Sequence, residues 1–306
     1  MRVLVAGSGA LGLYYGARMA AAGHAVVFWA RGENLAALRS AGLQVRSPRG
    51  DVHLAAPATA ADAAEAAAQG PYDLVLVLVK GYDNATVCRP ELRAALAPGG
   101  TVLTLQNGVD SARPLAAYFG DRVLAGIAFI GAERTAGGRV EHTAAGHIVV
   151  GEPAGGASGR SEQIAAAFAA AGVTAKASAH IGQEQWRKLL WNAAFNGPTA
   201  LARCYAHEFL AQPEGLAMAR TLMLEIVAVA QALGVALDAR AVDETLELTR
   251  TAGPVRTSML VDVERGRPLE YEAIYGPPLR EGRRLGVPTP VITALYAMLQ
   301  ARSAPL

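Results

Sequence analysis

The sequence predicts an α/β fold: an N-terminal domain with a Rossmann-type parallel sheet, followed by an all-helical C-terminal domain. In the first half, short runs rich in valine and leucine alternate with segments of helical periodicity. This alternation is typical of parallel strands covered by helices on both faces. From about residue 180 onward the strand pattern stops and long helical patterns follow. We therefore expect two domains, at 1–179 and 180–306.

The first domain is expected to contain five buried strands with helices between several of them. The expected strands are 2–7, 24–31, 72–80, 100–108 and 122–131, and the expected helices are 10–22, 33–41, 81–96 and 109–118. Further strand-like residues fill 139–152, and a glycine- and serine-rich loop follows at 153–161.

The second domain is expected to be built from helices alone. Breaks in the helical pattern occur at "LGV" and "LGVPTP", where glycine and proline end a helix. The expected helices are 181–202, 214–233, 238–250, 255–264, 270–285 and 289–301.

Composition and residue spacing argue against several classes of protein. The net charge is +2, from 28 basic and 26 acidic residues, and no dense basic tract occurs, so we expect no nucleic-acid partner. Cys88 and Cys204 lie far apart, which gives no disulfide framework and no metal-ligand spacing. The aliphatic run at 74–79 is too short to span a membrane, and the N-terminus lacks a signal-peptide pattern. A cytoplasmic protein without membrane or metal partners is expected.

The first motif is "GSGALG", residues 7–12, which follows a strand and opens a helix. Gly7 and Gly9 would permit a tight turn and the approach of a pyrophosphate, and Gly12 would allow close helix–sheet packing. The helix N-terminus would supply free N–H groups for the phosphates. A glycine-rich turn without a ligand is the alternative. The expected cofactor-binding residues of this loop are Gly7, Ser8, Gly9, Ala10, Leu11 and Gly12.

Three further residues are candidates for the cofactor region. The second strand ends "FWAR" with no acidic residue before Glu33, so Arg31 is expected to pair with a 2′-phosphate, which favours NADP over NAD. A solvated loop arginine is the alternative. Lys80 and Asn107 follow two central strands, and ligands of such sheets lie beyond the carboxyl ends of the strands. Polar residues that merely close a strand before a turn are the alternative.

The stretch "WRKLLWNAAFN", residues 186–196, places three polar side chains at steps of four on an apolar helix. Lys188, Asn192 and Asn196 therefore form one stripe, which near a domain junction is well placed to line a cleft. Asparagines orient substrate oxygens, and a lysine protonates the alkoxide that forms when a carbonyl is reduced. A solvated helix face with one buried hydrogen-bonded pair is the alternative.

Taken together, these motifs resemble those of the ketopantoate reductase (2-dehydropantoate 2-reductase) family. The resemblance covers nearly the whole chain. It is carried by "GSGALG", "WAR", "LVK", "QNGV", "WRKLLWNAAFNGPTAL", "TSML", "RPLEYEAIYG" and "REGRRLGVPTP". It implies NADPH-dependent reduction of 2-dehydropantoate to pantoate, a step of pantothenate biosynthesis, with a small 2-keto acid as substrate. A homodimer is an open expectation.

The resemblance also implies roles for individual residues. Lys188 would be the general acid and Glu270 would assist it. Asn192, Asn196 and Ser258 would hold the substrate, Asn107 would reach both substrate and cofactor, and Arg31 and Lys80 would bind the cofactor.

The chain departs from the family pattern at positions that affect substrate fit. Tyr275 and Glu272 stand where many members have asparagine and aspartate, and Val255 stands where some have asparagine. If Tyr275 and Val255 line the site, they remove hydrogen-bond capacity, which discriminates between similar substrates. A reductase of another 2-keto acid is therefore one alternative. A non-catalytic NADP-binding sensor is the other, although Lys188 and Glu270 argue against it.

Overall fold

The computed structural model describes residues 1–303, which form two compact units. The first consists of Met1–Gln106 and Ser111–Ile181. The second consists of Asn107–Asp110 and the chain from Gly182 onward. The loop at 107–110 thus follows a strand of the first unit but packs with the second.

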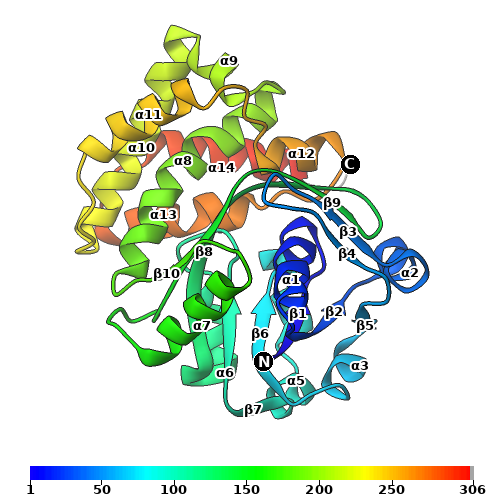
Figure 1. Cartoon of the computed structure of the whole chain (residues 1–306). Coiled ribbons are helices and arrows are strands. Elements are labelled where there is room, and N and C mark those ends of the chain that lie inside the picture. The colour runs from blue at the N-terminus through cyan, green and yellow to red at the C-terminus, as the bar shows by residue number, and fades with distance from the viewer. Residues whose placement is uncertain (304–306) are drawn as a thin grey trace. The chain divides into compact units, whose positions relative to one another are not determined.

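A mixed sheet of ten strands forms the centre of the first unit, within the described residues (Figure 1). Nine strands follow the order β4-β3-β9-β8-β7-β6-β1-β2-β5, and β10 pairs with β9. The strands are β1 (Arg2–Ala6), β2 (Ala25–Trp29), β3 (Leu43–Arg46), β4 (Val52–Leu54), β5 (Ala58–Ala60), β6 (Tyr72–Val77), β7 (Leu96–Thr104), β8 (Val123–Ala136), β9 (Arg139–Gly151) and β10 (Ala175–Ala177).

The helices of the first unit agree with the prediction at 10–22, 33–41 and 109–118, differ from it at 81–96, and include two helices, at 63–67 and 159–170, that were not predicted. They are α1 (Ala10–Ala21), α2 (Gly32–Ala41), α3 (Ala63–Ala67), the 3₁₀ turn η1 (Gly81–Asp83), α4 (Asn84–Val87), α5 (Pro90–Ala94), α6 (Ala112–Phe119), the 3₁₀ turn η2 (Gly120–Arg122) and α7 (Gly159–Ala170). The prediction of a single helix over 81–96 was wrong. Pro90 forces the preceding Arg89 into extended geometry, with φ −126° and ψ 140°, which separates α4 from α5.

Helices cover both faces of the sheet, as predicted for buried parallel strands. Successive residues of β1 point to opposite sides. Val3 and Val5 belong to a core that includes residues of α1 and α7. Leu4 and Ala6 belong to a second core with residues of α3, α5 and α6.

The strand order places a switch point beside β1. β1 pairs in parallel with β2 on one side and with β6 on the other. The chain therefore adds β2 on one side of β1 and later returns to add β6 on the other side. Open α/β sheets bind ligands beyond the carboxyl ends of the strands at such a point. The antiparallel pairs β8–β9 and β3–β4 extend this parallel centre.

The second unit is helical throughout its described residues, as predicted (Figure 1). Its helices are α8 (Ile181–Ala202), which begins at the junction, α9 (Ala206–Leu210), α10 (Pro213–Ala232), α11 (Arg240–Thr251), α12 (Ser258–Glu264), α13 (Tyr271–Leu285) and α14 (Pro290–Ser303). The core residues come mainly from α8, α10, α13 and α14.

Among the described residues, α10 is the one helix whose length and composition would suit a membrane span. Half of its apolar window is nevertheless buried inside the protein. Glu225 in this helix is 7% exposed, and its carboxylate accepts hydrogen bonds from Val291 N and Ile292 N at 2.9 and 3.0 Å. A buried carboxylate that caps α14 identifies α10 as a core helix of this unit.

Candidate active site

The glycine loop between β1 and α1 is shaped by close backbone contacts. Gly7 has φ +109°, and a Cβ there would lie 2.4 Å from Val79 N beyond the end of β6. A Cβ at Gly12 would lie 2.1 Å from the Gly7 carbonyl oxygen. Both positions therefore require glycine, the first for the turn and the second for close packing of α1.

The space over Gly9 fits the expected cofactor. Gly9 is the N-cap residue of α1, and a Cβ there would meet nothing within 4 Å. The first turn of the helix contains no acidic residue. Ala10 and Leu11 begin the helix and are only partly buried. Open space before free N–H groups at a helix N-terminus suits a pyrophosphate.

Ser8 has a structural role within the same loop. It is 7% exposed, and its Oγ donates to the Trp29 carbonyl at 2.8 Å, which ties the loop to the end of β2. Its own carbonyl accepts from Asn34 Nδ2 at 2.7 Å. Asn34, which the sequence analysis did not single out, also accepts from Gly138 N at 2.9 Å and so fixes the start of α2.

Arg31 and Lys80 both precede helical turns in the first unit. Arg31 is the N-cap residue of α2, and its guanidinium pairs with Asp83 at 2.8 Å while the side chain stays 67% exposed. Lys80 is the N-cap residue of η1, the turn that contains Asp83. Arg31 is thus accessible to a ligand phosphate, although a carboxylate already occupies one of its donors.

Gln106 is a residue that the sequence analysis missed at the end of β7. Its Nε2 donates to the Val79 carbonyl and to Asn84 Oδ1, each at 2.7 Å, and its Oε1 accepts from Thr104 Oγ1 at 2.9 Å. These bonds hold together the segments that follow β6 and β7. The sequence analysis selected the asparagine of the "QNG" motif. The position of Gln106 beside it, in the same motif, was the only feature of the sequence that could have identified this residue.

In the second unit, the loop after β7 brings Asn107 to the lysine of α8. Lys188 Nζ donates to Asn107 Oδ1 at 3.1 Å. Gly108 has φ +99°, and a Cβ there would lie 2.5 Å from the Ala273 carbonyl oxygen of α13. Arg280 of α13 also reaches Asp110 at 3.4 Å. The loop is therefore anchored on α13, and Asn107 is held against α8.

The electrostatic environment of Lys188 is unusual for a lysine. Burial lowers its pKa from 10.5 to about 8, and the negative charge of Glu270 acts in the opposite direction. Glu270 is 9% exposed and immediately precedes α13 as its N-cap residue. A lysine with a pKa near 8 gives up its proton more readily than an exposed lysine does.

The two asparagines of the stripe differ in their hydrogen bonding. Asn196 is 1% exposed; its Nδ2 donates to the Asn192 carbonyl at 3.0 Å, and its Oδ1 accepts from Ser258 Oγ and Met259 N at 3.1 and 3.2 Å. It thus joins α8 to the start of α12. Asn192 is also buried, and its Oδ1 lies 3.5 Å from Asn196 Nδ2. Ser258 is an exposed residue, and its Oγ, which donates to Asn196 Oδ1, can still accept a hydrogen bond.

Tyr275, which the sequence raised as a residue that could line the site, is buried instead. Tyr275 is 0% exposed, and its hydroxyl donates to the Ala193 carbonyl at 2.7 Å and accepts from Gly197 N at 2.8 Å. The ring is packed in the core and the hydroxyl is fully used by the backbone of α8. Val255 is partly buried against the same core, and its carbonyl accepts from Ala206 N at 3.2 Å.

The fold and these residues define a class, the nicotinamide-dependent oxidoreductases that join a Rossmann-type unit to a helical unit. Comparison with known proteins then identifies the family. The family description "Ketopantoate reductase PanE/ApbA" matches residues 3–155, and its C-terminal counterpart matches residues 180–303. The 2-dehydropantoate 2-reductase of Halobacterium salinarum is 33% identical over 302 residues, which cover 98% of each chain.

Solved structures agree with the sequence relatives. The crystal structure of 2-dehydropantoate 2-reductase from Geobacter metallireducens has a TM-score of 0.92 and 38% identity, and the match covers 99% of this chain and 100% of that one. The enzyme of the same name from Methylococcus capsulatus has a TM-score of 0.87 and 36% identity, with 100% and 99% covered. The chain belongs to the ketopantoate reductase family, and it is an NADP-dependent oxidoreductase that acts on a carbonyl group.

Proposed function

We propose that this protein reduces 2-dehydropantoate to pantoate with NADPH, and that Lys188 is the general acid. The observation that carries the proposal is the environment of Lys188. Its pKa is lowered to about 8 by burial, its Nζ is oriented by Asn107, and Glu270 acts on its charge. A proton donor is most effective when its pKa lies near the working pH.

The first unit would hold the cofactor. The N–H groups around Gly9 at the start of α1 suit the pyrophosphate, and Arg31 would bind the 2′-phosphate by charge-assisted hydrogen bonds. Lys80 and Asn107 would contribute further polar contacts. When bound, the reduced nicotinamide supplies the hydride that adds to the ketone carbon. The functional division would follow the predicted domains, 1–179 for cofactor and 180–306 for substrate and catalysis.

The second unit would hold the keto acid and manage its proton. Lys188 Nζ would donate a hydrogen bond to the ketone oxygen and transfer its proton as the alkoxide forms. The neutral amine that remains is stable because burial already disfavours the ammonium. Glu270 would stabilise the Lys188 ammonium before the proton is transferred, and it would accept a hydrogen bond from a substrate hydroxyl. Asn192 Nδ2 and Ser258 Oγ supply hydrogen-bonding groups for the carboxylate and hydroxyl, with Asn196 fixing their spacing.

A substrate panel tests this proposal. The purified protein is mixed with NADPH and either 2-dehydropantoate, pyruvate, 2-oxoisovalerate or phenylglyoxylate, and NADPH absorbance is followed. We expect the highest kcat/KM with 2-dehydropantoate. A higher value with another keto acid would instead identify a related reductase, and cofactor binding without oxidation would identify a sensor.

We also propose a cytoplasmic location and a homodimer for this protein. The family members matched here are metabolic enzymes by name, and one structure of the same fold is described as a dimeric ketopantoate reductase from Staphylococcus aureus. That chain is 22% identical, so it supports the fold rather than the assembly. Light scattering at micromolar concentration tests the dimer, and a monomeric mass would contradict it.

A further inference from the structure

Tyr275 connects the helix that follows Glu270 to the helix that carries Lys188. It lies in α13, five residues after Glu270, and its ring is fully buried in the core of the second unit. Its hydroxyl contacts two backbone groups of α8, Ala193 O at 2.7 Å and Gly197 N at 2.8 Å. One hydroxyl group thus bridges the two helices that hold the proposed acid and its carboxylate neighbour.

The two groups that Tyr275 contacts are those that an uninterrupted α-helix joins to each other. A helical N–H donates to the carbonyl four residues earlier, and Gly197 lies four residues after Ala193. Pro198 follows and has no N–H to give to the next carbonyl. An inserted side-chain group and a proline are both recognised causes of a local bend. The hydroxyl of Tyr275 therefore lies at the turn of α8 that immediately precedes Pro198.

This turn separates the members of the polar stripe. Lys188 and Asn192 precede Ala193, whereas Asn196 lies inside the turn between Ala193 and Gly197. Asn196 then contacts Ser258 at the start of α12, at 3.1 Å between the oxygens. A change in the turn would move Asn196 and Ser258 relative to Lys188.

Gly197 is matched to this arrangement. A Cβ at position 197 would lie 2.4 Å from the Tyr275 hydroxyl oxygen and 2.9 Å from Cζ of its ring. The tyrosine hydroxyl reaches the backbone of α8 only because residue 197 has no side chain.

We infer that Tyr275 is a positioning residue for the reaction: its hydroxyl fixes the α8 turn that sets Asn196 and Ser258 relative to Lys188, and α13 relative to α8. This inference rests on the proposed function and deepens it. It differs from the possibility raised by the sequence, in which Tyr275 would line the site and contact the substrate. The two roles predict different kinetics, because a contact residue discriminates between substrates and a positioning residue affects them alike.

Tyr275→Phe removes the hydroxyl and keeps the ring. We expect kcat/KM to fall about 10-fold, which is less than the roughly 100-fold loss that a misplacement of about 1 Å can cause. The loss should be equal, within about twofold, for the two best substrates of the panel, and the affinity for NADPH should stay within twofold. Gly197→Ala, whose methyl group would displace the hydroxyl, should reproduce this pattern. The alkaline limb of the kcat/KM profile should also shift, since Lys188 and Glu270 would change their separation.

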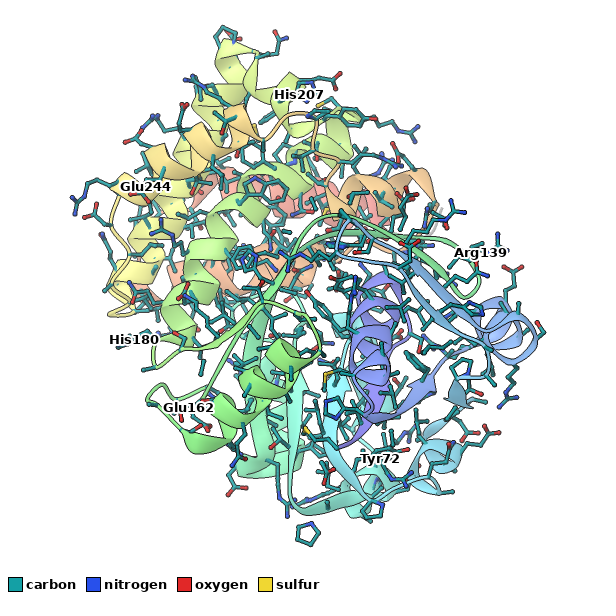
Figure 2. The ribbon with its side chains drawn as sticks, viewed as in Figure 1. Tyr72, Arg139, Glu162, His180, His207 and Glu244 are labelled. Carbon is teal, nitrogen blue, oxygen red and sulfur yellow. The ribbon has the colours of Figure 1, made fainter. Side chains whose placement is uncertain are left out.

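Tyr72→Phe is the matched control (Figure 2). Tyr72 is also fully buried, and its hydroxyl donates to the Ala66 carbonyl at 2.6 Å in the first unit. Its loss should lower the melting temperature while kcat/KM for the keto acid and its pH profile remain as in the wild type. Tyr275→Phe with wild-type kcat/KM and profile would overturn the inference, as would a loss confined to one of the two substrates.

A crystal structure of Tyr275→Phe tests the geometry independently of activity. We expect the Gly197 N–H to donate to the Ala193 carbonyl alone, at about 2.9 Å as in a regular helix, and Asn196 to move with this turn. An unchanged backbone over residues 186–202 would overturn the inference. If the wild type oxidises no NADPH with any keto acid, the proposed function fails, and this structural result still decides whether Tyr275 controls the turn.

Discussion

Lys188 is the residue that we propose as the general acid of the candidate site. Burial lowers its pKa to about 8, which leaves most of the side chain protonated at pH 7. Replacement by alanine should reduce kcat by about 10² to 10⁴-fold, because the alkoxide charge that the proton neutralises develops only near the transition state. The affinity for NADPH should change little. Steady-state kinetics and fluorescence titration of NADPH measure the two quantities.

The pH profile gives a second test of Lys188. A general acid is lost as pH rises through its pKa, so kcat/KM of the wild type should fall above about pH 8. Lys188→Ala should show a flat profile in this range. Glu270→Gln should retain the limb with a lower midpoint, because Glu270 raises the pKa of Lys188. A near-normal kcat in Lys188→Ala would mean that the polar stripe is structural.

Arg31 is the residue on which we expect the preference for NADPH to depend. Charge-assisted hydrogen bonds contribute about 1.5–3 kcal/mol, so Arg31→Ala should weaken NADPH binding by about 10- to 100-fold and change NADH binding within twofold. Asp83→Asn is the control, because it removes the carboxylate that pairs with Arg31 at 2.8 Å. NADPH should bind this variant at least as tightly as the wild type. An equal loss of both cofactors in Arg31→Ala would refute the assignment.

At the scale of elements, the long apolar strands and the long helices of the second unit were predictable from periodicity. β3, β4, β5 and β10 were missed because three or four residues carry too little pattern, and pairing with longer neighbours holds them in the sheet. α7 was missed because its first residues read as a glycine- and serine-rich loop. Its start is set by Ser158, whose Oγ accepts from Ser161 N at 3.2 Å.

The candidate site was predictable in composition but not in pairing. Periodicity placed Lys188, Asn192 and Asn196 on one face of α8 without indicating what each contacts. The partner of Lys188, Asn107, is 81 residues away along the chain, and only the folded loop at 107–110 brings it there. For the same reason the sequence could not decide whether Tyr275 lines the site, and the structure shows that its hydroxyl contacts the backbone of α8.

Glu225 tests how the helices of the second unit are held together. Both of its oxygens accept N–H groups from the first turn of α14, where the backbone donors have no partner within the helix. Glu225→Ala would leave these buried donors unsatisfied and should reduce the free energy of unfolding by about 1–3 kcal/mol. Urea unfolding measures the change. Glu214→Ala, an exposed glutamate in the first turn of the same helix, should change it by less than about 0.5 kcal/mol.

At the scale of the whole molecule, the two units divide the proposed tasks unequally. The glycine loop and Arg31 lie entirely in the first unit, so we expect the dinucleotide phosphates to need no group from the second. The keto acid is small, and its reacting carbon must touch the nicotinamide for hydride transfer. We therefore expect the bound cofactor to provide much of the surface that binds the keto acid. We expect NADPH to bind the free protein, and the keto acid to bind mainly to the binary complex.

Calorimetry separates this order from its alternatives. The keto acid is titrated into the free protein, into protein saturated with NADP⁺, and into protein saturated with 2′-phospho-ADP-ribose, which lacks the nicotinamide. Heat of binding should appear clearly only with NADP⁺. Equal binding of the keto acid with NADP⁺ and with 2′-phospho-ADP-ribose would show that the bound ligand acts by ordering the protein, because only NADP⁺ provides the nicotinamide surface. Tight binding to the free protein would show that Lys188, Asn192 and Ser258 recognise the keto acid on their own, and the ordered mechanism would then be wrong.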